Sequence, residues 1–384
     1  MKIKLALVML FTLLVGNACV AKHVLIVVGP DSHGPGSHEP IAGARLLAHG
    51  IENLQDPSGH TAEVVDKWPS KLQQDKAGTI VFLGDTFPPN RFEEAARNLA
   101  DLHKMMNRGC GIVCIHYATG LKKEDVSATG EHPLLGWMGG YFANPGSVHH
   151  VSYARVFDKA KITPSKTGHP ILRGWQEFVI RDEPYGNNYF GPHGNKPAPN
   201  VTILATSLQP PESPKREAVA WCVQRADKGR GFGIVMPHYY KNWAHDDLRT
   251  LVLNGIVWTA GIPIPKEGVE SAAPDLKSFG PKSVEAKWNL ISDFVTLCLK
   301  SYDWDDKAVW LPRMELLARE LMGRLNPEYA GAVYEHVFLV RGYLVAAVSN
   351  GGIAPSPVFS PPRIQARVSV ASVEPPSGPP SKLR

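Results

Sequence analysis

His23-Val-Leu-Ile-Val-Val28 is an unbroken apolar run, rich in β-branched residues, near the start of the chain. Such a run is typical of a strand that is buried on both faces of a parallel sheet. A glycine-rich loop over residues 29–38 follows it, and apolar residues then recur at helical spacing over residues 39–54. This order of strand, loop and helix predicts the first crossover unit of an α/β domain, with the strand in a central position.

The same alternation continues along the chain. Apolar runs at residues 79–83 and 110–115 predict two more strands, and the amphipathic residues 91–106 predict a helix between them. A final helix is expected over residues 246–260, where Gly261-Ile-Pro ends it. Further strands are expected at residues 148–156, 178–181, 201–205, 218–223 and 231–236. With right-handed crossovers, these elements predict a doubly wound, mostly parallel sheet.

The first 21 residues have the pattern of a secretory signal peptide. Lys2 and Lys4 precede an apolar run over residues 5–15, and Cys19-Val-Ala21 supplies a small-residue cleavage site. We therefore expect an exported protein, periplasmic or extracellular. Anchoring as a lipoprotein through Cys19 is less favoured, because no aliphatic residue lies three positions before it. No later stretch contains the roughly 20 apolar residues that a membrane-spanning helix needs.

The expected compact domain covers residues 22–265. Beyond it, residues 266–349 are predicted to form a partly helical extension, with helix-like stretches at 284–300 and 307–325. Residues 350–384 are rich in Pro and Ser and offer little to bury, so we expect a disordered tail there.

The charges of the chain exclude some classes of partner. The formal net charge is +5, from 41 basic and 36 acidic residues that are scattered along 384 positions. The lack of a basic stripe argues against nucleic acid as a partner. The loop over residues 29–36 has neither the G-x-G-x-x-G spacing nor a Walker lysine, which argues against nucleotide binding. The sequence leaves the oligomeric state open.

Two histidines follow strands of the predicted sheet. His116 comes directly after the strand at residues 110–115, and His238 follows the strand at residues 231–236. In doubly wound sheets the carboxyl ends of the strands meet at one edge, where ligands bind. We therefore predict that the two imidazoles lie close together around a shared cleft. The alternative for His116 is a buried imidazole that only caps its strand.

Other polar residues are expected to converge on the same edge. Two imidazoles with a carboxylate suit acid and base catalysis, hydrogen bonding to a sugar hydroxyl, or a divalent metal such as zinc. The loose spacing of these residues does not select among the three uses. Alternatively, the loop histidines are solvated and the acids cap a helix or pair with arginines. The candidates are His33, His38, Glu39, Tyr117, Asp182, Glu183 and Tyr185.

Six short segments follow one another along the chain: Gly29-Pro-Asp-Ser-His-Gly-Pro-Gly-Ser-His-Glu39, Gly111-Ile-Val-Cys-Ile-His-Tyr-Ala118, Gly136-Trp-Met-Gly-Gly-Tyr-Phe142, His169-Pro-Ile-Leu-Arg-Gly174, Asp182-Glu-Pro-Tyr185 and Gly231-Phe-Gly-Ile-Val-Met-Pro-His238. In this order they resemble the ThuA-like (trehalose utilisation) family. The resemblance spans residues 23–265 and implies a flavodoxin-like fold related to class I glutamine amidotransferases, with its cleft at the carboxyl ends of the strands. It also implies a sugar context.

The sequence departs from the amidotransferase pattern at two positions. An amidotransferase needs a thiolate after the strand, activated by a histidine that a carboxylate orients. Here His116 stands at the position of that cysteine, and Tyr240 stands where the orienting glutamate belongs. Cys114 lies in the middle of an apolar run and is expected to be a core residue. We therefore expect no glutamine hydrolysis.

The leading functional prediction is an exported protein of carbohydrate utilisation that binds, and in an enzymatic form transforms, a sugar or keto-sugar. We expect His116, His238 and Asp182 to be catalytic, with Asp182 or Glu39 orienting an imidazole. A non-catalytic carbohydrate-binding or scaffold module and a metal-dependent hydrolase are the alternatives. The expected substrate-binding residues are His33, His38, Glu39, Tyr117, Glu183 and Tyr185.

Overall fold

The structure is a computed structural model that describes residues 22–33, 36–56, 58–144, 147, 149–270 and 275–280. Its described residues fall into two compact units, each of which is treated by itself. The first contains residues 22–29, 44–238 and 242–270, and the second contains residues 30–43, 239–241 and 275–280. The predicted signal peptide, nearly all of the predicted helical extension and the predicted tail lie outside the described residues.

Half of the sheet in the first unit is parallel. Three of its strands are buried along almost their entire length, as their apolar, β-branched sequences predict. In sheet order, the parallel strands are β2 (Thr61–Val65), β1 (His23–Val28), β3 (Thr79–Leu83), β4 (Gly111–Ile115) and β11 (Arg230–Ile234). This order has the flavodoxin-like pattern, with β1 between β2 and β3, and it confirms the predicted α/β fold.

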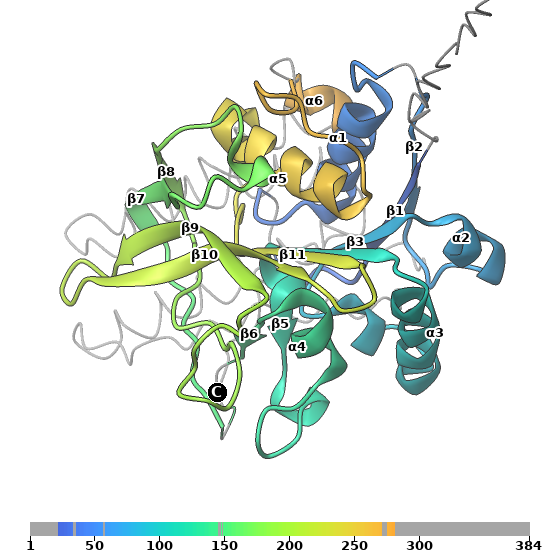
Figure 1. Cartoon of the computed structure of the whole chain (residues 1–384). Helices are drawn as coiled ribbons and strands as arrows, with labels where there is room; N and C mark the ends of the chain where they lie inside the picture. The colour runs from blue at the N-terminus through green and yellow to red at the C-terminus, as the bar shows by residue number, and fades with distance from the viewer. Residues whose placement is uncertain are drawn as a thin grey trace, which may run out of the picture. The chain divides into compact units, whose positions relative to one another are not determined.

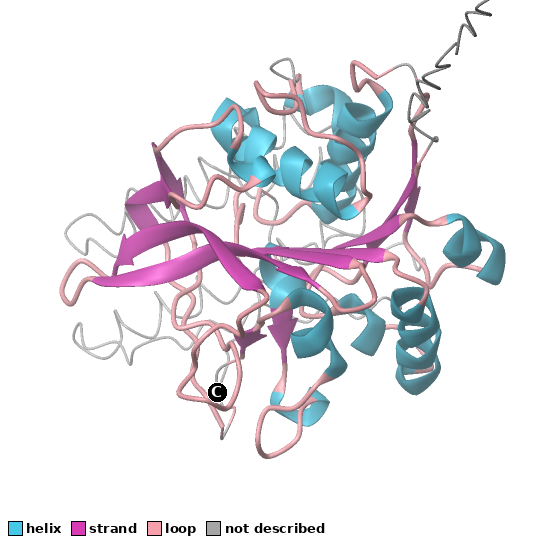
Figure 2. Ribbon diagram, viewed as in Figure 1, coloured by secondary structure: helices cyan, strands magenta, loops and turns pink. Residues whose placement is uncertain are grey.

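An antiparallel half continues the same sheet from β11 (Figure 2). Its outer strands alternate between buried and exposed residues, which is the pattern of a sheet with one solvated face. A β-bulge interrupts the pairing of two of its strands near Ala218. In sheet order, the strands after β11 are β10 (Lys215–Gln224), β9 (Val201–Gln209), β7 (Phe157–Pro164) and β8 (Phe178–Asp182).

The strand predicted at residues 148–156 is wrong for its described part, residues 149–156, which form only an isolated bridge at Tyr153. Side-chain hydrogen bonds hold this segment in place of the backbone hydrogen bonds of a paired strand. Ser152 Oγ donates to the carbonyl of Asn187 at 2.8 Å and accepts from the Ala143 N–H at 3.0 Å. The strand lies just after this segment, at β7, whose Asp and Lys residues conceal it from a search for apolar runs.

Helices cover both faces of the sheet in the first unit (Figure 1). On one face, α5 (Asp246–Thr259) lies beside the part of α1 (Pro40–Glu52) that follows Ala44, and α3 (Ala95–Asn107) and α4 (Pro133–Met138) lie on the other. A Cβ added to Gly50 of α1 would lie 3.0 Å from Leu253 of α5, so these helices are in close contact. The predicted helices at residues 39–54 and 246–260 are confirmed, and the helix predicted at residues 91–106 is present but begins four residues later, at Ala95.

Shorter elements complete the described chain, and none of its helices is long and apolar enough to cross a membrane. Two of the short strands, β5 (Gly120–Leu121) and β6 (Phe142–Ala143), pair with each other in parallel. The short helices are α2 (Lys71–Lys76), α6 (Leu276–Phe279) and the 3-10 turns η1 (Pro88–Asn90), η2 (His116–Thr119), η3 (Lys123–Asp125), η4 (Pro170–Leu172) and η5 (Tyr240–Ala244).

Local contacts hold the described residues of the second unit together. Ser37 and Tyr239 form an antiparallel bridge, and the N–H of Tyr240 donates to the Gly36 carbonyl at 3.0 Å. The Tyr240 hydroxyl donates to the Leu276 carbonyl at 2.8 Å. The glycine-rich loop and α6 therefore both contact the short segment at residues 239–241.

Candidate functional site

His116 lies where β4 turns sharply into η2. Its φ of +51° lies in the left-handed region, which residues with a side chain rarely adopt and which is enriched at functional sites. The Thr119 hydroxyl donates to the His116 carbonyl at 2.6 Å and closes the turn. Only 3% of His116 is exposed. The turn thus holds the imidazole inside the protein, at the carboxyl end of a central strand.

A backbone carbonyl sets the protonation of the His116 ring. Nδ1 of His116 lies 3.0 Å from the carbonyl oxygen of Val235, at the end of β11. A carbonyl can only accept, so Nδ1 carries the hydrogen and donates. In a neutral ring the lone pair is then on Nε2. Nε2 is the atom of His116 that can accept a proton or bind a metal.

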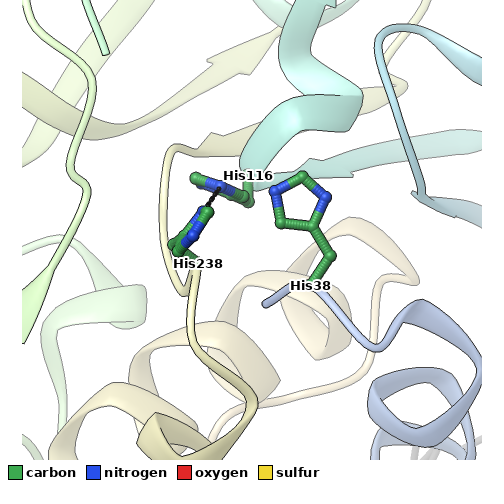
Figure 3. A group of neighbouring side chains, drawn as sticks. All are labelled: His38, His116 and His238. Atoms are coloured by element: carbon green, nitrogen blue, oxygen red, sulfur yellow. Dashed lines mark hydrogen bonds between the residues drawn. The ribbon is translucent and has the colours of Figure 1, made fainter. Parts of the chain in front are cut away.

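His238 meets His116 at this nitrogen (Figure 3). Nδ1 of His238 lies 3.1 Å from Nε2 of His116, and the rings lie edge to face with centroids 5.2 Å apart. Only 8% of His238 is exposed. The two imidazoles predicted to be neighbours are therefore in direct contact.

Glu183 faces both imidazoles. Its Oε2 lies 3.3 Å from Nδ1 of His238 and 3.8 Å from Nε2 of His116. The Glu183 side chain is 18% exposed, compared with 4% for His116 and 10% for His238. Glu183 therefore provides the more solvent-accessible side of this three-residue centre, which we call the His116–His238–Glu183 centre.

Tyr185 covers one face of His116. The two rings stack with centroids 4.6 Å apart, and the Tyr185 hydroxyl lies 3.1 Å from Nε2 of His116. Burial, followed by the charge of Glu183, raises the pKa of Tyr185 well above its ordinary value. The hydroxyl stays protonated at neutral pH and donates to the lone pair of His116.

Asp182 holds backbone groups rather than an imidazole. Its Oδ1 accepts from the N–H of His238 at 2.8 Å and from the N–H of Glu183 at 2.6 Å. Its Oδ2 accepts from the Asn242 side chain at 2.8 Å. Burial raises the pKa of the Asp182 carboxyl, although these donors oppose the shift. Asp182 fixes the positions of Glu183 and His238 and is therefore a positioning residue.

Tyr117 forms an edge of the centre. Its hydroxyl donates to Asn144 Oδ1 at 2.7 Å, and its ring lies edge to face with Tyr185 at 6.2 Å. Burial is the largest influence that raises the pKa of Tyr117 to about 12, so the phenol is not a base at neutral pH. The half-buried ring is suited to contact a ligand beside Glu183.

His33, His38 and Glu39 belong to the second unit. The His33 and His38 rings lie 3.6 Å apart, and Asp31 Oδ1 is 3.5 Å from Nδ1 of each. Glu39 Oε1 accepts from the Gly36 N–H at 3.0 Å, which makes Glu39 part of its own loop. His38 is also drawn in Figure 3. That these three residues share a site with His116 and His238 stays a prediction.

The described cysteines are core residues. Cys114 lies within β4, is fully buried and has its pKa raised well above the ordinary value by desolvation. Desolvation also raises the pKa of Cys110 to about 11 and that of Cys222 to about 12. A thiolate nucleophile needs the opposite shift. These three residues therefore lack the lowered pKa of a thiolate nucleophile.

Sequence reasoning missed two residues that shape the centre. Asn242 donates to Asp182, and Thr119 closes the turn at His116. Thr119 follows His116 by three residues, a spacing at which a hydroxyl commonly binds a backbone carbonyl, so this residue could have been found. Nothing in the sequence around Asn242 points to Asp182.

Known proteins resemble this chain in sequence and in structure. Residues 25–259 match the family described as ThuA: Trehalose utilisation. A ThuA-like protein from Bacteroides uniformis is 16% identical, with 63% of this chain and 93% of that chain covered and a TM-score of 0.45. A second, from Parabacteroides merdae, is 18% identical, with 68% and 99% covered and a TM-score of 0.42.

A more distant structure belongs to a GMP synthase protein from Thermoplasma acidophilum. It is 12% identical, with 63% of this chain and 95% of that chain covered and a TM-score of 0.34. A comparison with curated proteins found no match.

Proposed function

We propose that this chain, which belongs to the ThuA (trehalose utilisation) family, binds a sugar or keto-sugar at the His116–His238–Glu183 centre and transfers protons to and from it. Membership of the family supports a role in carbohydrate utilisation. The direct contact of His116 Nε2 with His238 Nδ1, at 3.1 Å, is the observation that carries the proposal.

The contacts of the pair support proton transfer. The Val235 carbonyl keeps the lone pair of His116 on Nε2, and His238 and Glu183 provide the next places to which a proton can move. Imidazole is an effective general base near neutral pH. A proton taken up by Nε2 is stabilised by the Glu183 carboxylate 3.8 Å away.

The chemistry of a keto-sugar fits such a base. Imidazole can remove the proton of a C–H bond next to a carbonyl when the electron pair moves onto the carbonyl oxygen and a hydrogen-bond donor stabilises the negative charge there. The Tyr185 hydroxyl and Glu183 are placed to hold neighbouring oxygens, and the half-buried Tyr117 ring supplies an apolar surface for a sugar face. If His116, His238 and Glu183 held a divalent metal ion, the ion would lower the pKa of a water molecule and so supply a second base.

The low exposure of the pair favours a second candidate function. At 3% and 8% exposure, His116 and His238 satisfy each other and leave little surface for a substrate. A non-catalytic carbohydrate-binding module would then use the more accessible Glu183 and Tyr117. The two functions differ in whether a bound sugar exchanges protons with solvent.

Hydrogen–deuterium exchange at carbon tests the proposed reaction. The full chain is incubated in D₂O with ketoses and oxidised sugars, and NMR follows loss of the C–H signal next to the carbonyl. We expect His116→Ala and His238→Ala to abolish the exchange. His103→Ala, an exposed histidine on α3, is the control and should keep the parental rate. Parental exchange in His116→Ala would refute the proposal, whereas saturable binding without exchange would support the binding module.

We also propose that the protein is exported. The sequence of residues 1–21 is the support for this proposal. Expression of the full chain in a bacterial host, followed by fractionation and mass spectrometry, should yield a secreted or periplasmic product that begins at Lys22. A product that keeps Met1 and stays in the cytoplasm would contradict it.

A further inference from the structure

We infer that His116 Nε2, His238 Nδ1 and Glu183 Oε2 form a binding site for one divalent transition metal ion of the zinc class. This inference deepens the proposed function, since the same side chains carry both. Metal binding itself, however, can be measured without any sugar. The two ideas can therefore fail separately.

The distances among the three donor atoms match a metal site. Zinc lies about 2.0–2.1 Å from nitrogen and carboxylate ligands in a tetrahedral arrangement, which places the ligand atoms about 3.4 Å apart. Here the separations are 3.1 Å between the imidazole nitrogens, 3.3 Å from His238 to Glu183 and 3.8 Å from His116 to Glu183. One ion can reach all three atoms with small side-chain movements.

The chemical types of the three donor groups also match a metal site. Two imidazoles and one carboxylate are the ligands of many catalytic zinc and iron sites, in which a further position stays open for water. Neutral imidazoles and one carboxylate leave one positive charge on a bound divalent ion. The Tyr185 hydroxyl, 3.1 Å from His116 Nε2, is placed to contact a water in the open position.

The proposed ligand His116 also makes the kind of supporting hydrogen bond that metal ligands usually make. A metal-bound imidazole usually donates its other N–H to a carbonyl or carboxylate, which fixes the ring and its tautomer. His116 does so through Nδ1 to Val235, and this leaves Nε2 for the metal.

Asp182 holds the backbone of the other two proposed ligands. One carboxylate oxygen accepts from the backbone N–H groups of both Glu183 and His238. It thereby fixes the spacing of two proposed ligands that are 55 positions apart in the sequence.

The decisive experiment measures metal binding by the untagged full-length chain. The protein is stripped with a chelator and titrated with Zn²⁺ by calorimetry and with Co²⁺ by visible absorption, which reports the coordination of the ion. We expect one ion per chain and the intense d–d bands of a four- or five-coordinate Co²⁺ site. Elemental analysis of the protein as purified gives an independent count.

Single substitutions assign the ligands. His116→Ala, His238→Ala and Glu183→Gln should each weaken Zn²⁺ affinity by more than about 100-fold, which exceeds the effect typical of residues beyond the ligands. Circular dichroism checks the fold, and Glu183→Gln keeps the test valid if a histidine variant fails to fold. His103→Ala and Asp158→Asn, both exposed, should bind like the parent.

Two outcomes would overturn the metal site. One is a chain that takes up no Zn²⁺ or Co²⁺ at millimolar concentration, and the other is uptake that Glu183→Gln and His238→Ala leave unchanged. If the chain takes up no metal but deuterium exchange into a keto-sugar persists, the direct proton transfer stands and the metal site alone fails. If the metal binds but no sugar exchanges, the metal site stands and the proposed reaction fails.

Discussion

Nε2 of His116 and Nδ1 of His238 lie 3.1 Å apart, although 122 positions separate the two residues in the sequence. Parallel pairing of β4 with β11 produces this proximity, because each histidine follows the carboxyl end of its strand. Two buried imidazoles at this distance can share one proton in a hydrogen bond.

Asp182→Asn should loosen the centre without removing any of its three donor side chains. An amide cannot accept as strongly as a carboxylate from the N–H groups of Glu183 and His238, and a hydrogen bond to a charged group contributes about 1.5–3 kcal/mol. We expect the free energy of unfolding to fall by about that amount and Zn²⁺ affinity to fall about 10–100-fold. Urea unfolding and calorimetry measure the two effects.

The control for this prediction is Asp158→Asn, which removes an exposed carboxylate that pairs with Arg181. Its unfolding curve and metal affinity should match those of the parent, since exposed ion pairs contribute little. Equal behaviour of the two asparagine variants would show that Asp182 has no positioning role.

Tyr185→Phe should slow the proposed reaction while keeping the ring that stacks on His116. The variant loses only the hydroxyl that lies 3.1 Å from Nε2. In the proposed reaction this hydroxyl holds a substrate oxygen, and the loss of one such hydrogen bond corresponds to roughly a tenfold lower exchange rate. Tyr117→Phe removes a hydroxyl that binds Asn144 and should affect substrate binding more than the rate. NMR exchange rates as a function of sugar concentration separate the effects, and an unchanged rate in Tyr185→Phe would contradict the assignment.

His132 should make the fold sensitive to mild acid. Its ring accepts from the Leu134 N–H at the start of α4, and burial lowers the pKa of His132 to about 4. Because the folded pKa lies below the unfolded value near 6.5, the stabilisation is complete above about pH 6.5. It decreases as the pH falls toward 4, by an amount on the order of 2–3 kcal/mol.

His132→Asn tests this dependence, because asparagine caps a helix but does not titrate. Urea unfolding at several values between pH 7 and pH 4 should show a shallower loss of stability in the variant than in the parent. Parallel curves for the two proteins would show that His132 does not titrate with unfolding.

Two helical glycines should respond to alanine with opposite signs. A Cβ at Gly255 of α5 would overlap the ring of Phe232 in β11, so Gly255→Ala should destabilise the fold by about 1–3 kcal/mol. A Cβ at Gly136 of α4 would meet nothing within 4 Å, so Gly136→Ala should stabilise it by about 0.5–1 kcal/mol. Thermal unfolding measures both, and a tolerated alanine at 255 would contradict the close contact of α5 with the sheet.

The parallel half of the fold could be predicted from the sequence because its strands are buried on both faces. β1, β3 and β4 are unbroken apolar runs, and this property does not depend on which neighbour each strand meets. β2 and β7 escaped the prediction because each is only partly buried and carries charged residues. Partial burial depends on tertiary neighbours, which apolar patterns do not specify.

Part of the candidate site could also be predicted from the sequence, and part could not. The proximity of His116 to His238 follows from strand order, which the crossover rules constrain. The proximity of Glu183 to these histidines does not follow from strand order. Glu183 comes after β8, which lies at the far end of the antiparallel half, beyond β10, β9 and β7. Hydrogen bonds of Asp182 to His238 and Asn242 bring the end of β8 to the centre. Such contacts depend on how the sheet curves, and no local pattern encodes that curvature.

The left-handed turn at His116 makes this position of the scaffold open to chemical substitution over evolutionary time. Pairing of β4 with its neighbours and the Thr119 hydroxyl set the backbone there, and neither depends on the imidazole. A single codon change could therefore present a thiol, an amide or a carboxylate at the same point in space. The same turn could in this way place different functional groups, and so serve unrelated reactions.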